Sequence, residues 1–464
     1  MARTAVAQLI ASDRLTIVVG LGATGLSVAR FLTARGERFL VVDSREAPPG
    51  LPDLRAELPD VPVELGVLNA QTLAGAGRLV VSPGLSLEEP ALVAAREQGV
   101  ELVGDIALFM AEARAPVIAI TGSNGKSTVT TLVGEMAREA GKNVGVGGNL
   151  GTPALELLDD KRELYVLELS SFQLDLLDKP SASVATVLNI SPDHMDRYAT
   201  LEAYHASKQR IYKGASSVVI NRDDMLTRAL VPPGVTVYSF GLGAPDFKGF
   251  GLRRQNGTAY LAYEFEALLP VAELAMKGRH NVANALAGLA LGQAVGLPMN
   301  AMLNTLRDFP GLPHRCETIA DEQKEVAGKR GITWINDSKA TNCGAAIAAI
   351  TGLADAESKR LLLIAGGQAK GQDFAALAQA ARGRVRLAIL LGQDATLMAQ
   401  ALAQYSPGTV VMMVGDMDAA VRAAGEAASP GDVVLLSPAC ASLDMFSGFA
   451  ARGERFRAAV EGLS

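Results

Sequence analysis

The fold of this 464-residue chain is decided by a glycine-rich stretch, TGSNGKST at residues 121–128. It follows the apolar run 115–120, which is typical of a buried strand, and it precedes apolar residues at helical spacing between 129 and 140. A strand, a glycine loop ending in Lys-Ser-Thr and a helix form the arrangement that a phosphate-binding loop requires. The loop is a shortened variant, because Ile120 stands where the usual spacing has another glycine.

The residue types of this loop suit nucleotide phosphates. Glycines let backbone N–H groups turn toward a phosphate, and the helix N-terminus adds the positive end of its dipole. Lys126 can reach the β- and γ-phosphates, and the Ser127 hydroxyl can bind Mg²⁺. A chance glycine turn is the alternative, which the flanking strand and helix disfavour.

Outward from this loop, the chain divides into three blocks of alternating strand-like and helix-like segments, with predicted boundaries at 1–104, 105–311 and 312–464. This alternation predicts parallel sheets and an α/β fold. Between about 236 and 276 short alternating runs surround Asn256-Gly257, which predicts β-hairpins in the central block.

Composition excludes several classes of protein. The net charge of −6 argues against a nucleic-acid-binding surface, and three widely spaced cysteines argue against a disulfide framework or a zinc ribbon. No apolar run approaches the roughly 20 residues that span a bilayer. Asp13 and Arg14 interrupt the first apolar stretch, so we expect no secretory signal. We therefore predict a soluble, cytoplasmic protein without a membrane or nucleic-acid partner.

A second glycine motif, GLGATG at residues 20–25, follows the first apolar run, and Asp43 ends the next one. This pattern is that of a dinucleotide-binding turn, in which the loop holds a diphosphate and the acid binds a ribose hydroxyl. Any nucleotide diphosphate would satisfy both contacts. A tight turn that binds no ligand is the alternative.

Two further polar residues follow predicted strands of the central block. Glu168 ends one strand and His194 follows another, so both should lie at the sheet edge that carries the phosphate loop. With Ser127 they could bind a divalent cation, although Mg²⁺ prefers oxygen ligands. A structural role for each residue is the alternative.

Lys208 lies in the apolar stripe of a predicted helix, 201–211. Either it extends to water, or it is buried with a lowered pKa. A buried neutral amine could take up CO₂ and become a carbamate with oxygen ligands for Mg²⁺.

Polar loops follow three predicted strands of the third block, at 336–342, 366–370 and 437–443. Their lysines suggest one binding edge for an anionic partner. In the central block, Asn149 is either a turn residue or a ligand-binding amide, and Asn281 could simply cap its helix.

Six motifs together resemble the Mur ligase family along the whole chain. They are TGSNGKST (121–128), LELSSFQL (167–174), DHMDRY (193–198), PHRCE (313–317), NDSKATN (336–342) and SPACASLD (437–444). The first is shared with folylpolyglutamate synthases and fixes only the superfamily. The others together resemble the members that add D-glutamate.

The resemblance implies a Rossmann-like N-terminal domain for a UDP moiety, a central P-loop mononucleotide-binding domain and a Rossmann-like C-terminal domain for an amino acid. It implies an ATP- and Mg²⁺-dependent ligase that joins D-glutamate to UDP-N-acetylmuramoyl-L-alanine through an acyl phosphate, in peptidoglycan precursor synthesis. We expect a monomer.

The resemblance also assigns residues. The ATP contacts would be Gly122, Ser123, Asn124, Gly125, Lys126, Ser127, Thr128, Asn281, Asn284, Arg315, Asp337 and Lys339. The UDP-substrate contacts would be Thr24, Asp43, Arg45, Gly84, Asn149 and His194. The glutamate contacts would be Thr341, Lys370, Ser442, Leu443 and Phe449. The metal ligands would be Ser127, Glu168, His194 and Lys208 as its carbamate, and the catalytic residues Lys126, His194 and Lys208.

Several alternatives stay open at this point. An L-glutamate-specific relative, a folylpolyglutamate synthase, an NAD-dependent dehydrogenase and a nucleotide-binding switch without turnover each account for part of the sequence. One departure from the family pattern is Gln368-Ala369 before Lys370, where the family often has Asp-Gly. It leaves the geometry of that loop open.

Overall fold

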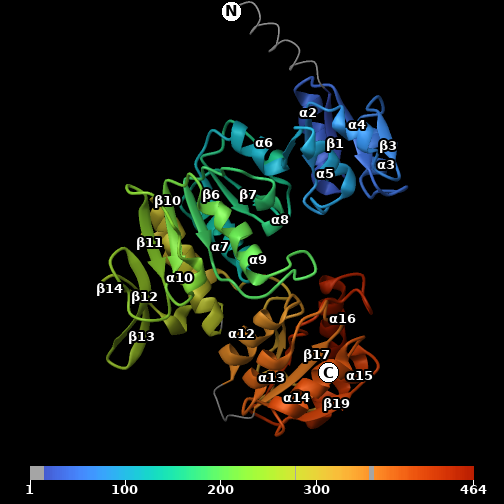
Figure 1. Cartoon of the computed structure of the whole chain (residues 1–464). Coiled ribbons are helices and arrows are strands. Elements are labelled where there is room, and N and C mark those ends of the chain that lie inside the picture. Colours follow the sequence, from blue (N-terminus) through green and yellow to red (C-terminus); the bar gives the residue numbers. More distant parts are fainter. Residues whose placement is uncertain (1–14, 277, 355–359, 464) are drawn as a thin grey trace, which may run out of the picture.

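The structure is a computed structural model that describes residues 15–276, 278–354 and 360–463. It contains three separate β-sheets in chain order, blue, teal to yellow, and orange to red in Figure 1. Each sheet has helices packed against it, as the strand–helix alternation predicts. No helix within the described ranges is long and apolar enough to cross a membrane. The expectation about a secretory signal concerns residues that lie outside the described ranges.

The first sheet is entirely parallel. Its strand order is β3 (Val63–Leu65), β2 (Phe39–Asp43), β1 (Thr16–Val19), β4 (Arg78–Val81) and β5 (Glu101–Val103). The helices of this part are α2 (Ala23–Ala34), α3 (Leu51–Glu57), α4 (Ala70–Ala74), α5 (Pro90–Glu97) and α6 (Asp105–Glu112). Strand order reverses on the two sides of β1, which places the GLGATG turn at the switch point of the sheet.

Glycine is required in this turn because the backbone approaches itself closely. Gly20 has a φ of +96°, a conformation that side chains disfavour. A side-chain carbon added at Gly25 would lie 1.9 Å from the Gly20 carbonyl oxygen. The turn therefore packs helix α2 directly against the end of β1.

The central sheet carries the phosphate loop. Its strand order is β14 (Glu266–Pro270), β13 (Thr258–Tyr263), β12 (Gly249–Gln255), β11 (Thr236–Phe240), β10 (Ser217–Asn221), β9 (Val184–Val187), β6 (Val117–Thr121), β8 (Leu164–Glu168) and β7 (Val144–Gly148). Its helices are α7 (Lys126–Glu139), α8 (Ser171–Asp175), α9 (Leu201–Gln209), α10 (Arg279–Ala294) and α11 (Met299–Asp308), with short 3₁₀ turns at Ala154–Leu157, Arg210–Tyr212, Met225–Thr227 and Val271–Glu273. Strands β9 and β8 flank β6 in parallel, so their following loops meet beside the phosphate loop.

Two local predictions for the central block are settled by the backbone. The hairpins are confirmed: β12 pairs antiparallel with β13 across Asn256 and Gly257, whose φ values of 50° and 83° fit a two-residue hairpin turn. The alternative that Asn281 caps its helix is wrong. Helix α10 begins at Arg279 after Gly278, so Asn281 already lies in its first turn.

The third sheet has one antiparallel edge strand and is otherwise parallel. Its order is β15 (Glu317–Ala320), β16 (Thr333–Asn336), β20 (Val433–Leu436), β17 (Leu361–Gly366), β18 (Val385–Leu391) and β19 (Val410–Met413), with helices α12 (Cys343–Leu353), α13 (Ala375–Ala381), α14 (Ala395–Tyr405), α15 (Met417–Ala427) and α16 (Phe449–Glu461). Strands β16, β20 and β17 are adjacent. The three polar loops that follow them therefore share one edge, as the sequence predicts.

Replacing Gly25 by Ala tests the close packing of the first turn. Alanine normally stabilises a helix relative to glycine. Here the added carbon collides with the Gly20 carbonyl, so we expect the free energy of unfolding to fall by about 2 kcal/mol. Gly84→Ala is the control, because no atom lies within 4 Å of its added carbon. Urea unfolding of both variants measures the difference, and equal stabilities would contradict the packing argument.

Candidate functional site

The phosphate loop connects β6 to α7 through two glycines with positive φ, Gly122 at 151° and Gly125 at 82°. The strand–loop–helix prediction is therefore confirmed. The Lys126 ammonium folds back over the loop and donates to the carbonyl oxygens of Gly122, at 2.8 Å, and Ser123, at 3.0 Å. Burial lowers the pKa of Lys126, although Glu168 and Asp193 favour its charged form.

Residues that follow β9 hold the loop in place. The Asn189 side chain accepts a hydrogen bond from Asn124 N at 2.8 Å and donates to Asn124 O at 2.9 Å. The Ser123 hydroxyl donates to the Ser191 carbonyl at 2.9 Å and lies 3.1 Å from the Tyr204 hydroxyl. These contacts fix the loop backbone from the side of the central sheet.

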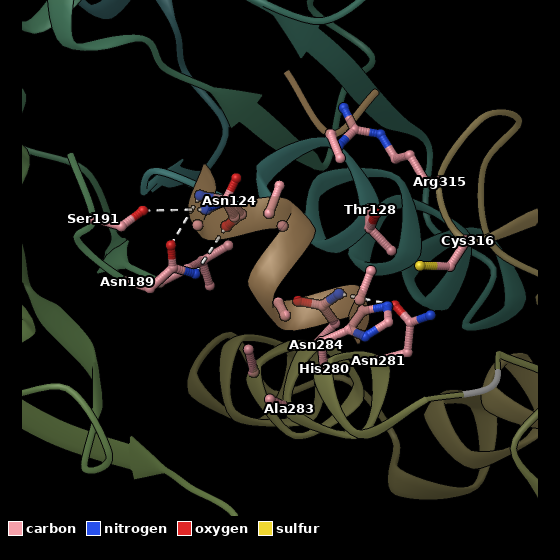
Figure 2. Close-up of a pocket in the computed structure, with 18 of the residues that line it drawn as sticks. Asn124, Thr128, Asn189, Ser191, His280, Asn281, Ala283, Asn284, Arg315 and Cys316 are labelled. Atoms are coloured by element: carbon pink, nitrogen blue, oxygen red, sulfur yellow. Dashed lines mark hydrogen bonds between the residues drawn. The ribbon is translucent and has the colours of Figure 1, made fainter. Parts of the chain in front are cut away.

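Two cavities adjoin the phosphate loop, and Asn124, Gly125, Arg315 and Lys339 line both of them. Figure 2 shows the first, of about 330 Å³, between the phosphate loop, helix α10 and residues of the third block that include Arg315 and Cys316. Asn281 and Asn284 line it and are joined by a hydrogen bond of 3.0 Å, and His280 lies beside them. Arg315, Asp337 and Lys339 line it from the third sheet. All the predicted ATP contacts after residue 128 therefore line one cavity.

The second cavity, of about 460 Å³, contains the predicted metal ligands. It is lined by Ser127, Glu168, His194 and Lys208 together with Lys126 and Asn149. Asn149 donates to Glu168 Oε1 at 2.8 Å, so its side chain makes a contact in this cavity as well as lying in a turn. Glu168 is buried, and among the described residues its Oε2 has no hydrogen-bond partner. The described residues contain no cluster of three His, Cys, Asp or Glu side chains that could bind a metal by themselves.

Lys208 is buried, with 1 % of its surface exposed, so the alternative that it extends to water is wrong. Its ammonium donates to Gly122 O at 2.9 Å and Thr121 Oγ1 at 3.2 Å, and it lies over the Tyr204 ring. Burial lowers the pKa of Lys208 well below its usual value, and the Lys126 charge lowers it further.

Charged groups of the third sheet reach the loop. Arg315 donates to Ser127 Oγ at 2.6 Å, and Lys339 lies over the Phe449 ring at 3.9 Å. Burial lowers the pKa of Lys339 to about 8, with Arg315 and Lys126 acting in the same direction. Burial also raises the pKa of Asp337 to about 7, against hydrogen bonds from Ser437 and Cys316.

The predicted UDP contacts on the first sheet lie away from both cavities, with Thr24 in α2 and Gly84 after β4. Asp43 accepts from Leu21 N at 2.6 Å and from the Arg45 guanidinium at 2.7 Å and 2.8 Å. Burial acts to raise the pKa of Asp43, but these bonds outweigh it, and the pKa is lowered. Both carboxylate oxygens are therefore engaged within the turn. Arg197 donates to the Gly84 carbonyl at 3.2 Å and so links this sheet to the central one.

The predicted glutamate contacts divide into two groups. Thr341, Lys370 and Phe449 line the second cavity. Ser442 and Leu443 are not among its lining residues, and Leu443 is 65 % exposed. The unusual Gln368-Ala369 segment keeps a regular backbone, because Gln368 forms a two-way bridge with Ala441. Lys370 follows with a φ of 52° and still reaches the cavity.

Four residues with structural roles at the site were missed by sequence reasoning. They are Tyr204, Arg197, Asn342 and Arg452. Tyr204 lies one helical turn before Lys208, a spacing that could have indicated it. Arg452 is buried in α16 and donates to Ser338 O at 2.8 Å and Cys440 O at 3.1 Å, so it fastens two of the polar loops together.

Models of known families match most of the chain. They are described as the Mur ligase MurD-like N-terminal domain (residues 14–104), the Mur ligase middle domain (120–292) and the Mur ligase glutamate ligase domain (314–440). The chain belongs to the Mur ligase family. The predicted α/β fold with three domains is thereby confirmed, while the boundaries at 104 and 311 stay predictions.

Curated relatives in the Mur ligase family match over nearly the full length. UDP-N-acetylmuramoylalanine–D-glutamate ligases of Pseudomonas syringae pv. tomato and Pseudomonas aeruginosa are each 56% identical over 98% of this chain and 100% of their own. The enzyme of the same name from Nitrosococcus oceani is 51% identical over 96% of both chains.

Solved structures of Mur ligases and a related ligase share the fold. A pseudomurein peptide ligase type C from Methanothermus fervidus has a TM-score of 0.59 at 17% identity, covering 97% of this chain and 100% of that one. UDP-N-acetylmuramate–alanine ligase from Thermotoga maritima has a TM-score of 0.58 at 18% identity, with the same coverage.

The titration of His194 tests the electrostatics of the second cavity. Partial burial lowers the pKa of this imidazole, Asp193 opposes that shift, and Lys126 and Lys208 lower the pKa further. Lys126→Met removes one positive charge, so we expect the His194 pKa to rise. Proton NMR can follow it, because the chain has four histidines and His194→Gln identifies the signal.

Lys142→Met is the matched control, since Lys142 follows the far end of α7 and pairs with Glu163. It should leave the His194 pKa unchanged. A His194 pKa that stays the same in Lys126→Met would contradict the proximity of the two charges.

Proposed function

We propose that this chain is a UDP-N-acetylmuramoylalanine–D-glutamate ligase, which joins D-glutamate to UDP-N-acetylmuramoyl-L-alanine with cleavage of ATP during peptidoglycan precursor synthesis. The observation that carries this proposal is the meeting of the phosphate loop with Lys339, Thr341 and Lys370 of the glutamate ligase domain around one cavity. Relatives that are 56% identical over the whole chain bear that enzyme name. We assign the enzyme to the cytoplasm and expect it to act as a monomer.

In the proposed first step, a carboxylate oxygen of the L-alanine unit attacks the γ-phosphorus of ATP. The bond to the β–γ bridging oxygen breaks, ADP leaves, and an acyl phosphate forms. Lys126 lies where it can neutralise charge on the transferred group, and Arg315 adds a second positive charge beside Ser127. Asn281 and Asn284 would hold the nucleoside in the first cavity.

In the second step, the amine of D-glutamate attacks the acyl carbon, loses a proton, and inorganic phosphate leaves. Thr341, Lys370 and Phe449 would orient the amino acid in the second cavity, and we assign Ser442 and Leu443 to the outer part of that site. The lowered pKa of His194 favours its neutral ring, which can accept the amine proton. Thr24, Asp43, Arg45, Gly84 and Asn149 would hold the UDP substrate.

The residues present also fit Mg²⁺. The buried, unpartnered Glu168 Oε2 and the Ser127 hydroxyl are oxygen donors on the same cavity wall, next to His194 and Lys208. Bound Mg²⁺ would neutralise negative charge on the nucleotide phosphates. Lys208 contributes by holding the Gly122 carbonyl, and as a carbamate it would offer two oxygens to the ion.

Phosphate release from ATP tests the function. We expect release that requires both UDP-N-acetylmuramoyl-L-alanine and D-glutamate. Lys126→Ala should reduce it by about a hundredfold to a thousandfold, because an electrostatic stabiliser of the transferred phosphoryl group is lost. Lys142→Ala is the control at the far end of α7.

Other outcomes separate the alternatives. Release with L-glutamate alone would replace the named amino acid while keeping the mechanism. Release that needs a folate substrate instead of the UDP-sugar would indicate a folylpolyglutamate synthase. ATP binding without any amino-acid-dependent release would indicate a nucleotide-binding switch, and NADH binding would indicate a dehydrogenase.

A carbamate on Lys208 makes a separate prediction. The lowered pKa of this buried lysine favours the neutral amine, which is the form that reacts with CO₂. With ¹³C-labelled bicarbonate, we expect a protein-bound carbamate carbon signal in NMR that disappears in Lys208→Arg. The same spectrum from both proteins would contradict the carbamate.

A further inference from the structure

We propose that Asn342 is a positioning residue that couples the amino-acid loop of the third sheet to the phosphate loop. The inference deepens the proposed function and rests on it. Asn342 ends the NDSKATN motif, directly after Thr341, and only 4 % of its surface is exposed. Its side chain is not needed to contact a substrate for the role that the structure assigns.

The Asn342 side chain makes three hydrogen bonds with distinct consequences. Its Oδ1 accepts from Ala345 N at 2.9 Å and so caps the N-terminus of α12. Its Nδ2 donates to Asn124 Oδ1 of the phosphate loop at 3.3 Å and to Asp193 Oδ2 at 3.1 Å. One amide thus joins α12 to two segments at the edge of the central sheet.

Helix α12 approaches that edge closely enough to require a glycine. A side-chain carbon added at Gly344 would lie 2.6 Å from Ser191 Oγ and 3.3 Å from Asn124 Nδ2. Ser191 Oγ cannot rotate away freely, because it accepts the hydrogen bond from Asn124 Nδ2. The same loop residue, Asn124, is therefore contacted by Asn342 and would be approached closely by a side chain at position 344.

In this proposal, these contacts set the distance between the amino-acid loop of the third sheet and the phosphate loop. Lys339 and Thr341 belong to the loop that ends at Asn342. Lys126 belongs to the phosphate loop, which also contains Asn124. If the hydrogen bonds from the Asn342 amide are lost, the loop that carries Thr341 can move away from the phosphate loop while each loop keeps its own fold. The attacking amine would then reach the acyl phosphate less often.

Asn342→Ser separates coupling from capping. Serine is a good N-cap and can keep the bond from Ala345 N, but it lacks the amide N–H groups. We expect thermal stability close to wild type, an unchanged KM for the UDP substrate, and kcat/KM for D-glutamate lowered about tenfold through the two lost hydrogen bonds. Asp416→Ala is the control, because the Asp416 side chain caps α15 of the third domain by accepting from Ala419 N, and within the described ranges it has no hydrogen bond to another domain. It should lower stability and leave these kinetic constants unchanged.

Gly344→Ala provides a second variant, whose expected effects on stability and activity are opposite to those of Asp416→Ala. Alanine favours the helix, so stability should be kept or raised, while the added carbon pushes α12 from Ser191 and lowers kcat/KM for D-glutamate. A merely structural role would move stability and activity together. Full activity in both Asn342→Ser and Gly344→Ala would overturn the inference.

Small-angle scattering provides a readout without turnover. With Mg²⁺ and a non-hydrolysable ATP analogue, we expect a larger radius of gyration for Asn342→Ser than for wild type or Asp416→Ala. Equal radii would overturn the coupling role. If wild type fails to use D-glutamate, the proposed function falls, while this measurement still decides the role of Asn342.

Discussion

The backbone of Gly125 sets the geometry on which the site depends. With a φ of 82°, it turns the chain from the phosphate loop into α7, and an added side-chain carbon would lie 2.7 Å from Asn284 Oδ1. Glycine at this position therefore allows both the turn into α7 and the close approach of α10 to the loop. Because β9 and β8 flank β6, the loop after β9 and the end of β8 lie on either side of this turn. Residues that follow β9 line both cavities, and Glu168 at the end of β8 lines the second.

Buried positive charge is the main energetic cost of the site. Burial lowers the pKa of Lys126, Lys208, Arg315 and Lys339, so each side chain is held where its charged form is disfavoured. A polyphosphate entering between them offsets that cost, because its negative charge replaces the lost hydration. The cations are thus positioned before the ligand arrives, and little reorganisation is needed during phosphoryl transfer.

Sequence reasoning located most of this edge because loops after parallel strands converge, whatever lies between them in the chain. It placed the phosphate loop, Glu168 and the three polar loops by that rule. It could not find the contact from Asn342 to Asn124, since the two residues lie 218 positions apart on different sheets. Residue type alone favours Asn281 as a cap, because it cannot show that the helix begins earlier, at Arg279 after Gly278. The pattern around Asp43 predicts a ribose contact, which stays a prediction, but it could not show that a near neighbour, Arg45, donates to both carboxylate oxygens.

The three domains are joined by different kinds of contact. One continuous apolar core contains residues of the first sheet, such as Val18, and of the central sheet, such as Tyr165, with Phe109 of α6 packed edge-on against the Tyr165 ring. Among the described residues, the cores of the third sheet are formed by residues from its own part of the chain. Its links to the phosphate loop are polar, through Arg315 and Asn342. Separating an apolar core exposes its surface to water, whereas polar contacts can be exchanged for water at small net cost. If the domains separate to admit substrates, we expect the third domain to move relative to the other two. Its hydrogen bonds to the phosphate loop would then be broken and remade in each catalytic cycle.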